Sequence, residues 1–199
     1  MRILFLLLCA PALLAGEPAR RRAVEHQSRV ANVERVFLVI LENTDATLAE
    51  TLPFVTRLAA RGALLRNDHC ITHPSQPNYI AIVSGSPLGV TGSEPVTIDA
   101  SHLGDLVERK GLGWKIYAEN FPGGCYLGET FGTVADGQYV RRHVPFLSFL
   151  NVQQNIARCV THVVNARSFD DDLVAGALPN LALYIPDNLH NGHDSNAFV

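Results

Sequence analysis

The fold class follows first from a continuous apolar run, Val36-Phe37-Leu38-Val39-Ile40-Leu41, which leads directly into Glu42-Asn43. An uninterrupted apolar run rich in β-branched residues is typical of a strand buried on both faces of a parallel sheet. Its abrupt end places a carboxylate and a side-chain amide oxygen at the carboxyl end of that strand. Hard divalent cations prefer such oxygen ligands. The alternative is a helix cap or a solvated loop, which is the ordinary role of polar residues after a strand.

Strand and helix patterns alternate along the rest of the chain. Further strands are expected over residues 63–65, 114–118 and 181–185. Helices are expected over residues 53–61, 78–83, 102–109, 146–150 and 169–175, with Pro77 opening the second and Ser168 capping the last. Most of residues 120–165 is expected to be irregular. This alternation predicts an α/β fold, with a mostly parallel sheet flanked by helices on both faces and ligands bound beyond the carboxyl ends of the strands.

Composition excludes some classes of protein. The chain has 199 residues, of which 47% are hydrophobic and 18% are charged, and its net charge is −3. This apolar content is enough for one packed core and differs from the low hydrophobicity and high charge of disordered chains. No sustained basic stripe is present, so we expect no nucleic-acid partner.

The first residues differ from the rest. Arg2 precedes an apolar run from Ile3 to Ala15, which is typical of a secretory signal peptide. We therefore expect a signal peptide over residues 1–16, a polar leader over 17–33 and a single domain over 34–199. The run is too short to span a bilayer, and the alternative is a buried N-terminal helix or strand. The expected protein is secreted or periplasmic, with no integral membrane segment after the signal is removed.

Signal removal leaves three cysteines, Cys70, Cys125 and Cys159. Exported proteins meet an oxidising compartment, so a disulfide is expected. Cys125 and Cys159 lie in loop-like sequence that flanks one irregular segment, and we predict that they pair. Cys70 is then left over, and the alternative is that all three thiols are free.

Two polar segments could carry chemistry. Ser75 lies just ahead of a helix whose first turn is fixed by Pro77. Unpaired amides at such a helix start attract anions, so a phosphate held there would lie beside the serine hydroxyl. Coordination to a metal can activate a serine for attack, whereas the alternative is a simple capping role.

The second polar segment follows the last expected strand. Asp187, His190, His193 and Asp194 place two carboxylates and two imidazoles within eight residues of a glycine-containing loop. Such a donor set suits zinc or a mixed nitrogen and oxygen metal site. The alternative is a solvated polar loop.

These segments are more specific in combination than singly. They are Leu41-Glu42-Asn43, Thr72-His73-Pro74-Ser75-Gln76-Pro77-Asn78-Tyr79, Tyr139-Val140-Arg141-Arg142-His143-Val144-Pro145-Phe146, and the stretch from Pro179 to Asp194. In this order they resemble the phosphoesterase family of bacterial and fungal acid phosphatases and phospholipases C, within the alkaline phosphatase superfamily. The resemblance covers residues 35–196 and implies an alkaline-phosphatase-like fold.

The resemblance also implies roles for individual residues. Glu42 and Asn43 would bind a divalent metal ion, zinc or another divalent cation, and Ser75 would be the nucleophile that forms a phosphoserine. Asn78 would hold a phosphate oxygen, and His143 would lie near the phosphate. The ligands of a second metal would include Asp187 and His193. We therefore expect Glu42, Ser75 and Asp187 to converge at one edge of the sheet.

Members of the family continue further, through a strand that ends in an acidic pair and a later histidine. The resemblance thus implies that this chain represents the N-terminal two thirds of the domain, with the C-terminal part missing. The favoured function is an acid phosphatase acting on small phosphomonoesters. The alternatives are a phospholipase C or other phosphodiesterase, and a truncated relative that binds phosphate or metal without turnover. The sequence predicts no particular oligomeric state.

Overall fold

The computed structural model describes residues 33–42 and 44–193. The predicted signal peptide, nearly all of the leader, and Asn43 lie outside the described residues. Residues from Arg35 onward belong to one compact unit. Among the described residues, every helix is too short or too polar to cross a membrane.

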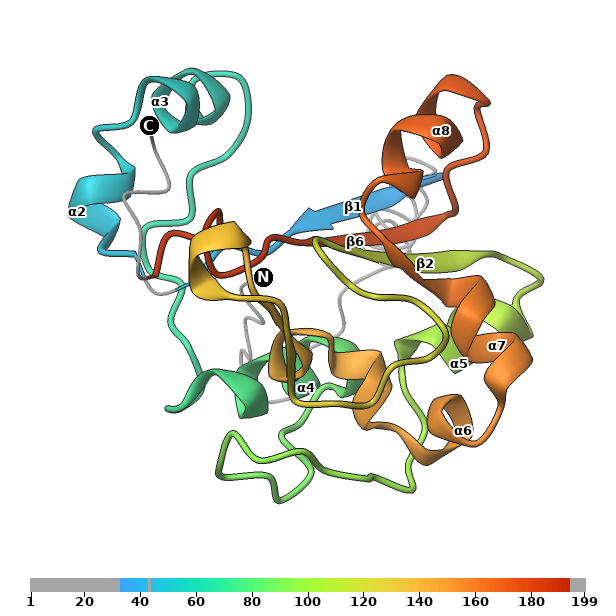
Figure 1. Ribbon diagram of the computed structural model, residues 1–199. Helices are drawn as coiled ribbons and strands as arrows, with labels where there is room; N and C mark the ends of the chain where they lie inside the picture. The colour runs from blue at the N-terminus through green and yellow to red at the C-terminus, as the bar shows by residue number, and fades with distance from the viewer. Residues whose placement is uncertain (1–32, 43, 194–199) are drawn as a thin grey trace, which may run out of the picture. The chain divides into compact units, whose positions relative to one another are not determined.

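Four parallel strands form the central sheet, in the order β1-β6-β2-β5 (Figure 1). The strands are β1 (Val36–Val39), β2 (Trp114–Ala118), β5 (Val163–Asn165) and β6 (Leu181–Ile185). The register aligns the starts of three strands, because Leu181 of β6 is paired with Val36 on one side and with Trp114 on the other. A separate antiparallel pair joins β3 (Thr130–Phe131) to β4 (Tyr139–Val140). The predicted α/β class with a parallel sheet is therefore confirmed.

Helices and short 3-10 turns connect these strands. The helices are α2 (Ala46–Ala49), α3 (Pro53–Ala59), α4 (Ser75–Ser84), α5 (Leu103–Arg109), α6 (Leu150–Gln153), α7 (Ile156–His162) and α8 (Ser168–Val174). The 3-10 turns are η1 (Val134–Asp136), η2 (Arg141–His143) and η3 (Pro145–Ser148).

The side chains of each strand alternate between the two faces of the sheet, and both faces are covered. On one face, Phe169 of α8 packs against the rings of Phe37, Tyr117 and Tyr184 at centroid distances of 5.2, 5.4 and 5.8 Å. On the other face, Trp114 packs against Phe146, and the main core of buried apolar side chains lies here. Figure 1 shows α8 on one side of the strands, with α4, α5 and α7 on the other. Helices thus cover both faces, as predicted.

The first strand differs from its prediction. The apolar run was expected to form a strand buried on both faces of a parallel sheet, but β1 lies at the edge of the described sheet and pairs only with β6. Val36, Phe37 and Val39 are consequently exposed by 42%, 43% and 54%. An apolar run indicates that a strand favours burial, whereas its place in the strand order depends on the connections between strands.

Other boundaries also differ. Residues 63–65 form no strand, while β5 and α7 lie within a stretch predicted to be irregular. Helix α4 begins at Ser75 rather than after Pro77, because proline is tolerated throughout a first turn whose amide groups have no helical partner. Helix α8 begins with Ser168 itself, and the N-cap position is Arg167 with no side-chain cap. The helix predicted over residues 146–150 is replaced by the 3-10 turn η3, and α6 begins only at Leu150.

Candidate active site

Carboxylates follow three of the four parallel strands at the same edge of the sheet. Glu42 lies just beyond β1, Glu119 follows β2 directly, and Asp187 lies two residues beyond β6. The backbone ties the first and last of these segments together, since the amide of Glu42 donates to the carbonyl of Asn191 at 2.7 Å. Polar side chains therefore gather at the edge where parallel sheets bind ligands.

Ser75 contacts Glu42 directly. The Ser75 hydroxyl, on the first residue of α4, donates a hydrogen bond to Oε1 of Glu42. Glu42 is only 7% exposed, whereas Ser75 is partly exposed. Two residues 33 positions apart are thus joined, and the serine keeps a side open to solvent.

Asn78 holds the loop that precedes Ser75. Its Oδ1 accepts hydrogen bonds from the amides of Ile71 and Thr72, at 2.9 and 3.2 Å. Its Nδ2 donates to the carbonyls of Thr72 and Pro74, at 2.7 and 3.1 Å. Both ends of the amide are therefore engaged by residues 71–74, and Asn78 fixes the approach of the chain to Ser75. Its expected contact with phosphate stays a prediction.

His143 lies on the inner side of the same carboxylate. Its Nε2 is 3.7 Å from Oε1 of Glu42 and has no hydrogen-bond partner among the described residues. The ring stacks on Tyr79, with centroids 4.9 Å apart and planes inclined by 21°. The Tyr79 hydroxyl in turn lies 3.4 Å from Oε2 of Glu42. Glu42, Ser75, Tyr79 and His143 therefore form one contiguous cluster.

Burial sets the protonation states in this cluster. His143 is 4% exposed. Burial, reinforced by the charges of Arg142 and His193, lowers the pKa of His143 to about 3. Its imidazole is therefore neutral at ordinary pH. Burial and the nearby Glu42 carboxylate raise the pKa of Tyr79 above its usual value, so the tyrosine keeps its proton and donates.

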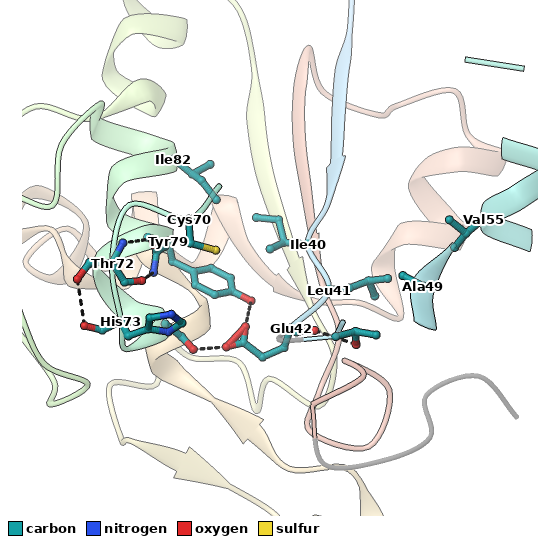
Figure 2. A pocket seen from close by; sticks show the side chains of 13 residues that line it. Ile40, Leu41, Glu42, Ala49, Val55, Cys70, Thr72, His73, Tyr79 and Ile82 are labelled. Atoms are coloured by element: carbon teal, nitrogen blue, oxygen red, sulfur yellow. Dashed lines mark hydrogen bonds between the residues drawn. The ribbon is translucent and has the colours of Figure 1, made fainter. Parts of the chain in front are cut away.

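A pocket of about 370 Å³ opens beside the cluster. Its polar lining is Glu42, Thr44, Thr72, His73, Ser75 and Asn78. Its apolar lining includes Ile40, Leu41, Ala49, Val55 and Ile82 (Figure 2). A ligand can therefore reach the Ser75 hydroxyl from solvent.

Asp187 belongs to a neighbouring cluster with Glu119 and His190. These three residues offer ligand atoms that all lie within 4.8 Å of one another. Nδ1 of His190 lies 2.8 Å from Glu119 and 3.2 Å from Asp187. The hydrogen bond to Glu119, assisted by the Asp187 charge, raises the pKa of His190. Asp187 thus shares the sheet edge with Glu42 and Ser75 but directs its carboxylate toward other partners.

The two remaining predicted metal ligands are His193 and Asn43. His193 is exposed near the end of the described residues, and its amide donates to Oδ1 of Asn191 at 2.9 Å. Asn43 lies outside the described residues. Among the described residues, the cluster around Asp187 contains Glu119 and His190 but not His193, so the structure groups Asp187 with His190 rather than with His193.

Comparison with known proteins identifies the family to which the sequence belongs. A model of the family described as "Phosphoesterase family" matches residues 33–199. The chain belongs to the Phosphoesterase family.

Named relatives of this phosphoesterase-family chain are phosphatases. It is 33% identical over 195 residues to an acid phosphatase of Aspergillus fumigatus, covering 94% of this chain and 43% of that protein. It is 33% identical over 190 residues to a phosphate-repressible acid phosphatase of Penicillium chrysogenum, covering 92% and 46%. It is 29% identical over 174 residues to a phosphatidylinositol-3-phosphatase of Mycobacterium tuberculosis, covering 85% and 54%. The chain therefore spans about half the length of these curated relatives.

The donor chemistry at Glu42 fits a hard divalent cation. A carboxylate oxygen and a hydroxyl oxygen are in contact, and both are ligands that such cations accept. A hydroxyl can rotate its proton aside and offer a lone pair while the carboxylate also binds. The unpartnered Nε2 of His143 close by indicates that the cluster as it stands leaves a polar group for a ligand to satisfy.

In the cluster around Asp187, hydrogen bonds from N–H groups already occupy both oxygens of Asp187 and one oxygen of Glu119. Oδ1 of Asp187 accepts the amides of Leu189 and His190, at 2.8 and 3.0 Å. Its Oδ2 accepts Nδ2 of Asn120 at 2.7 Å. Oε2 of Glu119 accepts the amide of Asp187 as well as the His190 ring. These N–H donors hold the loop after β6 in place.

Sequence reasoning missed Glu119 and Tyr79 as site residues. A signal for Glu119 was present, because strand 114–118 leads into Glu119-Asn120 just as the first strand leads into Glu42-Asn43. A signal for Tyr79 was its position four residues after Ser75, on the same face of a helix. His190 was within the quoted loop, and its pairing with Glu119 depends on the adjacency of β2 and β6.

Proposed function

We propose that this protein hydrolyses phosphomonoesters through a phosphoserine formed on Ser75. One observation carries the proposal: the Ser75 hydroxyl is hydrogen-bonded to the buried Glu42 carboxylate, with the unpartnered Nε2 of His143 3.7 Å from the same oxygen. A nucleophile and a carboxylate thus line one open pocket, with an imidazole that can donate to an anion on the inner side of the carboxylate. The names of the fungal relatives support a monoester substrate.

The reaction follows from these positions. Ser75 Oγ attacks phosphorus and the bond from phosphorus to the ester oxygen breaks on the opposite side, while the serine proton leaves to solvent through the open pocket. The departing alkoxide takes a proton from solvent. Water then attacks the phosphorus of the phosphoserine, the bond from phosphorus to Ser75 Oγ breaks, phosphate leaves, and the serine oxygen regains a proton from solvent.

His143 acts as a hydrogen-bond donor in this scheme. Since burial lowers its pKa to about 3, the ring carries no extra proton to transfer near neutral pH. A neutral imidazole with its proton on Nε2 can still donate to an equatorial phosphoryl oxygen, where negative charge develops in the transition state. The geometry therefore favours charge stabilisation over general acid catalysis for His143.

We further propose that a divalent cation binds at Glu42, Ser75 and Asn43. When bound, the cation would supply positive charge that offsets the repulsion between an anionic ester and the serine oxygen. Asp187 and His193 stay predicted ligands of a second cation. The oxygen-rich chemistry of Glu42 and Ser75 supports the first of these proposals.

Export is part of the proposal. The disulfide between Cys125 and Cys159 supports an oxidising compartment, in which such bonds persist. The apolar run at residues 3–15 supports delivery there by a signal peptide.

Hydrolysis of p-nitrophenyl phosphate tests the proposed function. The full chain is assayed with Mg²⁺, Mn²⁺, Zn²⁺ and Ca²⁺ in turn, and the Ser75→Ala variant is expected to lose at least about a thousandfold in turnover. Ser84→Ala, at the other end of the same helix, is the matched control and is expected to keep wild-type turnover. Equal turnover in Ser75→Ala and wild type would contradict the nucleophile, and no turnover with any cation would contradict the activity.

A further inference from the structure

Two hydroxyl groups of one helix reach the two oxygens of one carboxylate. Ser75 and Tyr79 are four residues apart on α4, so they lie on the same face of the helix. Ser75 donates to Oε1 of Glu42. The Tyr79 hydroxyl lies 3.4 Å from Oε2 of the same carboxylate (Figure 2). The helix therefore fixes which carboxylate oxygen faces the proposed nucleophile.

The Tyr79 ring also supports the third member of the cluster. It lies nearly parallel to the ring of His143, at a centroid distance of 4.9 Å and an interplanar angle of 21°. Both side chains are 4% exposed, so the contact is shielded from solvent. His143 in turn directs Nε2 toward the Glu42 oxygen to which Ser75 donates. Tyr79 thus touches both groups that flank the serine.

Rotamer preferences alone leave these two groups poorly oriented. The last torsion of a glutamate side chain and the ring torsion of a histidine have broad and roughly two-fold profiles. Their final orientation must therefore come from neighbouring atoms. For Glu42 and His143, Tyr79 supplies a neighbour on each side through its hydroxyl and its ring face.

We propose that Tyr79 is a positioning residue, which orients the Glu42 carboxylate through its hydroxyl and the His143 imidazole through its ring. The proposal rests on the proposed function, because it assigns Tyr79 to the phosphoester chemistry of Ser75. Tyr79 acts through Glu42 and His143, without contact to the reacting phosphorus. Misorientation of either group slows the reaction of bound substrate, so the expected effect is on kcat rather than on KM.

The competing explanation is that Tyr79 only fills the core. The chain offers a matched control in Tyr139, which is 1% exposed and has a buried hydroxyl without a hydrogen-bond partner among the described residues. Tyr79→Phe and Tyr139→Phe each remove one buried hydroxyl and keep the ring. Only the first removes the contact with Glu42. Tyr79→Leu removes the stacked ring as well.

The experiment measures p-nitrophenyl phosphate kinetics, thermal melting and Mn²⁺ affinity for the full chain and these three variants. For Tyr79→Phe we expect kcat and Mn²⁺ affinity to fall about tenfold each, with KM within twofold of wild type. For Tyr79→Leu we expect kcat to fall about a hundredfold. Tyr139→Phe is expected to stay within twofold of wild type in every kinetic and binding measurement.

The outcomes separate this proposal from the proposed function. If Ser75→Ala abolishes turnover while Tyr79→Phe stays within twofold of wild type in kcat and Mn²⁺ affinity, the positioning role is wrong and the proposed function stands. If Tyr139→Phe loses as much kcat as Tyr79→Phe, the effect is structural and the positioning role is again wrong. If the wild-type chain has no turnover, the proposed function fails. In that case a tenfold loss of Mn²⁺ affinity in Tyr79→Phe supports the orientation of Glu42, and unchanged or absent binding overturns it.

Discussion

Removal of the disulfide between Cys125 and Cys159 tests how this structure holds its candidate site. The bond links the loop after β2 to helix α7, and both half-cystines are buried. The closed loop contains β3, β4 and the turn η2, which carries His143. Only short elements lie within it, so the crosslink restrains a segment with little regular structure of its own.

The sequence separation of 34 residues between the two cysteines determines how much the disulfide contributes to the free energy of unfolding. In the chain-entropy model, closing a loop of this size removes an unfolded-state entropy worth about 4 kcal/mol at 25 °C. For a domain of this length, about 4 kcal/mol corresponds to a fall in melting temperature of roughly 8–16 °C. We expect the double variant Cys125→Ala, Cys159→Ala to lose this amount, and the loss to appear as a lower urea midpoint.

Urea unfolding followed by circular dichroism measures the loss. Reduction of the wild-type protein with dithiothreitol is a second test, because it opens the bond without removing any side-chain volume. Cys70→Ala is the control, since Cys70 is exposed and outside the disulfide, and it is expected to unfold at the wild-type urea concentration. A loss below about 1 kcal/mol in both the double variant and the reduced protein would refute the entropic reasoning.

Two further predictions concern the core. A Cβ at Gly104 would lie 2.7 Å from the Trp114 ring, so Gly104→Ala should destabilise the protein by about 2 kcal/mol. A Cβ at Gly92 would meet no atom within 4 Å, so the control variant Gly92→Ala should change stability by less than about 0.5 kcal/mol. Equal urea midpoints for the two variants would contradict this packing. Burial lowers the pKa of His102 in the folded protein. In the unfolded chain this histidine becomes protonated near pH 6.5, whereas in the folded protein it stays neutral at that pH. Stability should therefore fall as pH decreases below about 6.5, and urea midpoints at pH 7.5 and 5.5 should differ less in His102→Asn than in wild type.

Local sequence patterns predicted most of the strands and helices of the fold. The strands at 114–118 and 181–185 have the predicted bounds, because each is an apolar run between polar or glycine-containing segments. Strand β5 was not predicted, since its three residues directly follow a helix and provide no boundary signal of their own. The edge position of β1 was also inaccessible to local reasoning, because strand order is a property of the whole chain.

Part of the candidate site was also predictable from local sequence motifs. Glu42 and Ser75 each belong to a short motif that can be identified without knowledge of the neighbouring elements. Their contact, and the stack of Tyr79 on His143, depend on how η2 packs against α4. The pairing of Asp187 with Glu119 likewise depends on β2 and β6 being adjacent strands.

The two Glu-Asn pairs at the strand ends show why a motif alone does not define a cation site. Asp187 accepts hydrogen bonds from backbone and side-chain N–H groups, which can only donate. Glu119 accepts from the Asp187 amide on one oxygen and from the Tyr184 hydroxyl on the other. Glu42 instead accepts from the hydroxyl groups of Ser75 and Tyr79 among the described residues. A hydroxyl can turn its proton away and present a lone pair, so a cation can approach Glu42 and Ser75 together. At Glu119 and Asp187 a cation would have to displace N–H donors that hold the loop after β6. Among the described residues, Glu42 thus accepts only from hydroxyl groups, whereas Glu119 also accepts from an N–H group, and this difference favours Glu42 and Ser75 as the site of the first cation.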